Sequence, residues 1–158
     1  MEEKNIYEIL KSMEIEYKVL EHEPISSVKE FLFTLEGQQV KNIVLKAKKT
    51  NNHYFVILHD EKSINLSDLA EKLGEKRLSF ASSNVIEENL KCIAGAITAF
   101  GLMYDTNNIF KVIVDKAVDK TTTIGMHPFI NTKTLNIKYS DFEKFLKKYN
   151  HDIEYIDL

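Results

Sequence analysis

Two apolar segments separated by a short polar turn are the feature that most limits the folds open to this chain. Asn42 to Ala47 and Tyr54 to His59 are rich in β-branched, leucine and aromatic side chains, and the turn between them contains Asn51 and Asn52. Asparagine tolerates the backbone geometry of tight turns, and short apolar runs on either side of such a turn are typical of paired strands. The sequence therefore predicts a β-hairpin over these residues.

The remaining segments predict a mixture of helices and strands. Helices are expected where apolar residues recur at helical spacing or where a serine can cap the first turn, and strands where β-branched residues gather. The predicted helices cover residues 3–13, 26–35, 67–73, 84–90 and 141–149, with caps at Ser26 or Ser27, Ser67, Ser82 or Ser83, and Ser140. The predicted strands cover residues 17–20, 97–100, 109–114, 121–124, 134–137 and 153–156. The sum is an α+β fold, and without repeats or linkers it forms one domain over residues 1–158.

Composition limits the partners and the compartment. A formal net charge of −3 argues against a broad nucleic-acid-coating face, because Lys and Arg that neutralise phosphate supply most non-specific affinity. Lys41, Lys46, Lys48 and Lys49 could still contact the end of one nucleic-acid strand. Charged residues beside a turn are, however, more often simply solvated at the tip of a hairpin. The single cysteine excludes an internal disulfide, and the sequence lacks a signal peptide and an apolar run of membrane-spanning length. We expect a cytoplasmic protein without membrane or DNA partners.

General catalytic motifs do not explain the chain. The phosphate-binding, dinucleotide-binding, nucleophile-elbow and zinc-protease patterns are missing, and no Cys/His group has the spacing of a zinc site. Cys92 lies in an apolar stretch, where a buried and inert thiol is commoner than a nucleophile. His53, His59 and His151 have no neighbours that suggest a ligand set, and we interpret them as surface or structural residues.

Three polar segments within apolar surroundings are the candidate site: residues 41–42, 95–98 and 127–132. Lys41 at the start of a strand either extends to solvent or holds an anionic ligand as a fixed cation. Gly95 either supplies a positive φ for a turn or lets a substrate approach bare backbone N–H groups. His127 precedes a proline, which favours an extended loop where the imidazole is either a titrating group or a structural one.

In order and spacing these segments resemble the YbaK/prolyl-tRNA-synthetase-associated domain family, which includes the editing domain of bacterial prolyl-tRNA synthetases and its free-standing relatives. The segments that carry the resemblance are His22-Glu23-Pro24, Lys41 to Leu45, Leu78 to Ser82, Gly95 to Leu102, His127-Pro128, Asn131-Thr132 and Ile156 to Leu158. Almost the whole chain is covered. Its length and its Asp-Leu end are most similar to the free-standing alanyl-tRNA(Pro) deacylases of the PrdX type.

The resemblance implies a central mixed, barrel-like β-sheet surrounded by helices, and hydrolysis of the ester in mischarged alanyl-tRNA(Pro). It implies no metal and no organic cofactor. The implied partner is the acceptor end of tRNA(Pro) carrying a wrong amino acid, with a loose association with prolyl-tRNA synthetase as a further option. The oligomeric state is left open.

The same resemblance assigns roles to individual residues. Lys41 would anchor the terminal nucleotide, Gly95 would bind the aminoacyl group through the backbone, and His127 would line the pocket and bond the amino group or a water. Further substrate-binding residues by this resemblance are His22, Asn42, Ala96, Ile97, Thr98, Ala99, Asn131 and Thr132. The chain departs from the family pattern at Ala99, where the family has proline, so loop rigidity and substrate choice are in question.

Two other functions fit the sequence. One is a deacylase for another mischarged tRNA, such as cysteinyl-tRNA(Pro) or seryl-tRNA. The other is a non-catalytic module of the same fold that senses aminoacyl-tRNA or an amino acid, which the change at Ala99 would favour.

Overall fold

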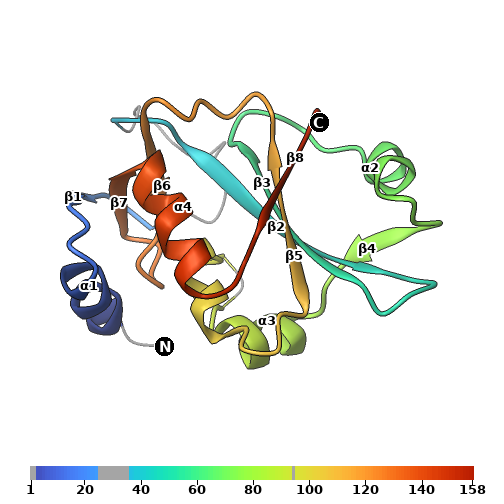
Figure 1. Ribbon diagram of the computed structural model, residues 1–158, viewed down its shortest axis with the longest axis horizontal. Coiled ribbons are helices and arrows are strands. Elements are labelled where there is room, and N and C mark those ends of the chain that lie inside the picture. The colour runs from blue at the N-terminus through green and yellow to red at the C-terminus, as the bar shows by residue number, and fades with distance from the viewer. Residues whose placement is uncertain (1–2, 25–35, 94) are drawn as a thin grey trace.

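The computed structural model describes residues 3–24, 36–93 and 95–158 of the chain (Figure 1). The predicted helix at 26–35 therefore lies outside the described residues. Those described form the helices α1 (Glu3–Ser12), α2 (Leu66–Leu73), α3 (Ser83–Leu90) and α4 (Tyr139–Lys148), and a 3-10 helix, η2 (Ala99–Tyr104). None of these helices is long and apolar enough to cross a membrane.

The described strands form two sheets. An antiparallel sheet of three strands has the order β1-β7-β6, with β1 (Lys18–Glu21), β6 (Thr123–Met126) and β7 (Lys133–Lys138). A mixed sheet of five strands has the order β4-β2-β3-β5-β8, with β2 (Val40–Ala47), β3 (His53–His59), β4 (Leu78–Phe80), β5 (Phe110–Asp115) and β8 (Ile153–Ile156). The predicted α+β class is confirmed.

The predicted hairpin is confirmed as β2 and β3, paired from Val40 opposite His59 to Lys46 opposite His53. Side chains alternate between the two faces of a strand, and both faces of this hairpin are buried. Val44 belongs to the larger hydrophobic core, whereas its neighbour Leu45 belongs to a smaller one. This alternation fixes which face each polar residue of β2 occupies.

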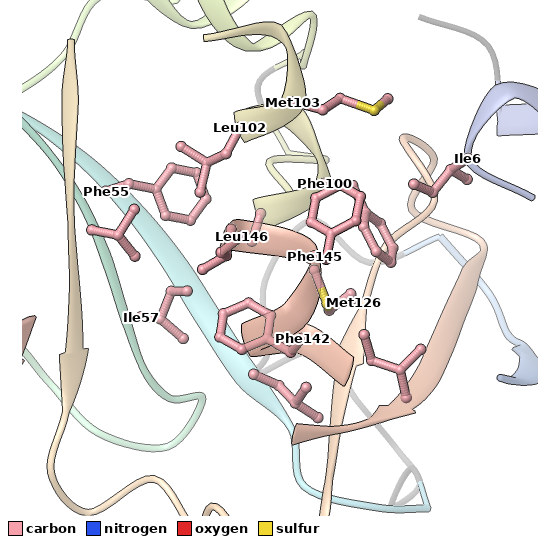
Figure 2. Packing of buried hydrophobic residues seen from close by; sticks show 14 of the residues in the cluster. Ile6, Phe55, Ile57, Phe100, Leu102, Met103, Met126, Phe142, Phe145 and Leu146 are labelled. Atoms are coloured by element: carbon pink, nitrogen blue, oxygen red, sulfur yellow. The ribbon is translucent and has the colours of Figure 1, made fainter. Parts of the chain in front are cut away.

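The larger core joins the two sheets to the helices. Figure 2 shows Phe55 and Ile57 of β3 beside Phe142, Phe145 and other residues contributed by α1, η2, β6 and α4. The smaller core lies on the other face of the five-stranded sheet, where α2 contributes Leu69 and Ala70. Burial of these apolar side chains is the main force that holds the two sheets together.

Two predicted helix caps are wrong. The side chain of Asn65, and not Ser67, caps α2 by accepting a hydrogen bond from the Asp68 N–H at 3.1 Å. Helix α4 starts at Tyr139 without a side-chain cap, because burial of the Tyr139 ring in the larger core draws the first turn inward. The predicted cap at Ser82 and the predicted end at Gly74, which has φ +71°, are confirmed.

The predicted strand at 97–100 is wrong, because this segment turns into η2. Thr98 caps η2 by accepting a hydrogen bond from the Phe100 N–H at 3.3 Å, and residues 99–103 are all buried. A continuous apolar run has no periodicity that separates a buried strand from a buried helix. The strand predicted at 121–124 lies two residues further on, as β6, since Asp119 holds Thr121 in a turn.

Candidate active site

His22 and His127 form one side of the candidate site. Because β1 pairs with β7, His22 at the end of β1 lies beside the start of β7, and its backbone N–H donates to the Thr132 carbonyl at 2.9 Å. His127 follows β6, the other neighbour of β7. The two imidazole rings meet edge to face with centroids 6.5 Å apart. The structure thus brings His22, His127 and Thr132 together.

Hydrogen bonds define the tautomers of both rings, since a carbonyl oxygen can only accept. The Nδ1–H of His22 donates to the Glu23 carbonyl at 2.9 Å, and its Nε2 shares a second hydrogen bond with the buried Thr134 hydroxyl, also at 2.9 Å. The Nδ1–H of His127 donates to the Lys133 carbonyl at 3.2 Å. The lone pair of His127 therefore resides on Nε2, which makes no hydrogen bond to any residue that the structure describes.

Burial lowers the pKa of His127 below its ordinary value. The hydrogen bond to the Lys133 carbonyl opposes this change, whereas the charge of a protonated His22 adds to it. His127 is consequently a neutral imidazole at neutral pH, with a basic nitrogen available to a water molecule or to a substrate amino group.

The loop at 95–98 forms a second part of the site. Gly95 is exposed and has φ +87°, and among the described residues no atom lies within 4 Å of the place where a Cβ would be. Gly95 thus has the positive φ of a turn residue, and the described residues also leave room for a substrate to approach its backbone. The Asn42 side-chain N–H donates to the Ile97 carbonyl at 3.0 Å, which fastens this loop to β2.

The rest of this loop leads into the core. Ala96 is buried, and the Thr98 side chain is fully buried as the cap of η2. Ala99 is the first residue of η2, a position where a proline is well accommodated because its backbone N–H has no partner within the helix. The family proline could stand there without a change of backbone, so Ala99 alters the stiffness of the loop more than its path.

A pair of aromatic rings connects the two parts of the site. Phe129, two residues after His127, has φ +67°, and its ring packs against Tyr104 of η2 with centroids 6.0 Å apart. A positive φ is rare for a residue other than glycine and turns the chain sharply after Pro128. Neither Phe129 nor Tyr104 was predicted, since nothing in their spacing marks a contact between distant segments.

Lys41 lies apart from these groups. It is half-buried and opposite Leu58 of β3, and strand alternation places it on the face of Ile43 and Leu45, whereas Asn42 occupies the opposite face. Its ammonium lies near the Asp60 carboxyl, whose pKa is raised by burial despite the lowering effect of Lys41. Within residues 3–24, 36–93 and 95–158, Lys41 forms no hydrogen bond with the other candidates. Its catalytic role stays a prediction.

The remaining candidates differ in position. Asn131 is half-buried in the same loop as Thr132 and interacts with other groups. Cys92 is buried, which raises the pKa of its thiol to about 11 and leaves it a poor nucleophile. His151 is fully buried against Asp105 at 3.0 Å. No group of three His, Cys, Asp or Glu residues among the described positions could hold a metal ion.

Comparison with known proteins identifies the fold as that of an editing domain. Residues 22–145 match the aminoacyl-tRNA editing domain family. The chain belongs to this family, which confirms the resemblance found in its motifs.

Two relatives and one solved structure illustrate the similarity. The chain is 31% identical over 152 residues to the prolyl-tRNA editing protein ProX of Acetoanaerobium sticklandii, which covers 94% of this chain and 93% of that protein. It is 31% identical over 133 residues to the multifunctional Ser/Thr-tRNA deacylase ProXp-y of Escherichia coli K12, covering 80% and 77%. The crystal structure of a proposed trans-editing enzyme for prolyl-tRNA synthetase matches with a TM-score of 0.65 at 12% identity, over 99% of this chain and 96% of that one. This last likeness concerns the fold.

Proposed function

We propose that this protein is a trans-editing aminoacyl-tRNA deacylase that hydrolyses alanyl-tRNA(Pro). The observation that most supports this proposal is the neutral His127 beside His22, whose Nε2 forms no hydrogen bond with the described residues. The chain also belongs to the editing family. In the reaction, water adds to the carbonyl carbon of the ester and the bond to the ribose oxygen of the terminal adenosine breaks. The products are free alanine and a tRNA with its hydroxyl restored.

The residues around the site support this reaction without a side-chain nucleophile. His127 Nε2 is placed to accept a hydrogen bond from the attacking water or from the substrate amino group. The open backbone at Gly95 offers a surface for the aminoacyl group, and the bond from Asn42 to Ile97 holds that loop in position. Lys41 is the proposed cation for the terminal nucleotide, which it would meet at the edge of the site.

Selection of alanine over proline would follow from size. A small pocket admits the alanine methyl group and excludes the pyrrolidine ring, which is the second sieve of an editing scheme. Similarity to a Ser/Thr-tRNA deacylase supports a second candidate substrate, a seryl ester, and cysteinyl-tRNA(Pro) has a side chain of similar size. The acceptor end of tRNA(Pro) is the proposed partner, in the cytoplasm, with a loose association with prolyl-tRNA synthetase as a further part of this proposal.

The test is a deacylation assay with alanyl-, cysteinyl-, seryl- and prolyl-tRNA(Pro) at neutral pH. We expect loss of alanine and retention of proline, with a rate reduced about a hundredfold in Lys41→Ala, because a misplaced ester loses most of the benefit of positioning. Lys138→Ala is the matched control, since Lys138 is an exposed lysine at the start of α4. If only the seryl ester is hydrolysed, the substrate is seryl-tRNA and not alanyl-tRNA(Pro). Binding of charged tRNA without hydrolysis of any ester would instead identify a sensing module.

A further inference from the structure

A group of exposed cations lies at the turn between β2 and β3 and in the segment just before β4. We call it the hairpin surface, and it consists of Lys46, Lys48, Lys49, Lys76 and Arg77. The backbone brings the two segments together, because the Lys48 N–H donates to the Arg77 carbonyl at 3.0 Å and Lys46 lies opposite Ser79. Within the described part of the chain, none of the five forms an ion pair.

A buried carboxylate holds these two segments in a fixed arrangement. Glu75, just before Lys76, accepts hydrogen bonds from the Tyr54 hydroxyl at 2.6 Å, the Asn52 amide at 2.9 Å and the Thr50 hydroxyl at 3.2 Å. The bonds from Tyr54 and Asn52 hold the pKa of Glu75 below its ordinary value, so the carboxylate stays ionised. Glu75 contributes one negative charge beside the five cations of the hairpin surface, so their sum stays positive.

The hairpin surface continues from the face of β2 that borders the candidate site. Asn42, Val44 and Lys46 alternate onto one face of β2, and Asn42 is bonded to the 95–98 loop. Lys46 lies four residues beyond Asn42 on β2, which is about 13 Å at the rise of a strand. A few unpaired nucleotides at the 3′ end of a tRNA can span this distance.

We propose that the hairpin surface binds the phosphate groups of the tRNA acceptor arm while the charged 3′ end occupies the site between Gly95 and His127. This inference rests on the proposed function. The five cations form a local positive region on a chain whose net charge is −3, and clustered Lys and Arg side chains bind phosphates by releasing condensed counterions. Such contacts position the nucleic acid and do not read its sequence, so the surface sets affinity and orientation and leaves the choice of amino acid to the pocket.

The experiment compares two variants with the same change in charge. The test variant is Lys46→Gln/Lys48→Gln/Arg77→Gln. The control is Lys138→Gln/Lys147→Gln/Lys148→Gln, whose exposed residues lie at the two ends of α4, a helix that Figure 1 shows apart from β4. Binding of uncharged tRNA(Pro) is measured by fluorescence anisotropy at several salt concentrations. Deacylation of alanyl-tRNA(Pro) gives KM and kcat, and circular dichroism verifies that each variant is folded.

The test variant should bind uncharged tRNA about tenfold or more weakly, and the slope of log Kd against log salt should fall by about two to three. Its KM should rise similarly while kcat at saturating tRNA is kept, and the control should match the wild type in every measurement. Equal tRNA affinity and salt slope in a folded test variant would overturn the proposal and leave the surface for another partner, such as an acidic protein. If the wild type bound tRNA through this surface but hydrolysed no ester, the proposed function would fail and the binding surface would stand.

Discussion

Gly95 combines a left-handed backbone with a side-chain position that the described residues leave open, and one substitution separates these two properties. Asparagine tolerates a positive φ better than other residues with a side chain, so Gly95→Asn should keep the fold and the melting temperature. Its side chain would nevertheless fill the open space. We expect kcat/KM for charged tRNA to fall about tenfold or more, because the aminoacyl group loses close contact with the backbone.

The comparison with Gly95→Ala completes this test. Alanine at a positive φ should cost about 1 to 2 kcal/mol of stability, which urea denaturation would measure. If Gly95→Asn kept full activity, the glycine would serve only the turn.

His127 should make the stability of the protein depend on pH. Its pKa in the folded protein lies below the ordinary histidine value of about 6.5, which holds in the unfolded chain, so the unfolded chain binds more protons between these two pKa values. The contribution of His127 to stability is therefore complete above about pH 6.5 and is lost as the pH falls toward the folded pKa. We expect the urea midpoint to fall between neutral pH and about pH 5.5, and to fall less in His127→Asn.

The pH dependence of deacylation should also reflect the protonation of His127. In the proposed mechanism the neutral imidazole is the active form, so we expect kcat/KM of the wild type to hold down to a pH below 6.5 before it declines. If the urea midpoint of His127→Asn falls with acid as much as that of the wild type, groups other than His127 cause the loss of stability.

At the scale of elements, a single buried carboxylate at the end of β5 connects three segments. Asp115 is fully buried, bonds to Lys62 after β3 at 2.7 Å, and accepts the N–H groups of Ala117 and Leu158 at 3.2 Å each. Although burial alone would raise the pKa of Asp115, the Lys62 ammonium and these N–H groups hold it below the ordinary value. The network fastens the segment after β8 to the five-stranded sheet.

Removal of this carboxylate should therefore be costly. Asp115→Ala leaves the Lys62 ammonium and two N–H groups without their acceptor, and we expect a loss of about 3 kcal/mol in the free energy of unfolding, measured with urea. Asp119→Ala is the matched control, because the exposed Asp119 carboxylate bonds to nearby Thr121. A loss below about 1 kcal/mol in Asp115→Ala would show that water replaces the carboxylate.

Elements with a clear local signal could be predicted from the sequence. The hairpin of β2 and β3 follows from two apolar runs and an asparagine turn, and α1 follows from its helical periodicity. The 3-10 helix η2 could not be predicted, because its buried residues form an unbroken apolar run. Strand β4 was missed since its three residues are too few to show alternation.

At the scale of the whole molecule, the candidate site depends on pairings that no local pattern contains. The polar segments at 41–42, 95–98 and 127–132 were recognised along the chain, and their order led to the family. The approach of His22 to Thr134 and His127 requires β1 to pair with β7, and the bond from Asn42 to Ile97 requires β2 to lie against a distant loop. Sequence spacing holds no information on either contact.

The pairing of β1 with β7 also sets an order of assembly. The β2–β3 hairpin joins segments that are adjacent along the chain, whereas Val19 must find Leu135 near the opposite end, and closing so long a loop carries a larger entropy cost. On the ribosome, β7 is synthesised after β2, β3 and β4. A nascent chain would thus display the hairpin surface before its two histidines can meet, so the capacity to hold tRNA would be acquired before the capacity to cut the ester.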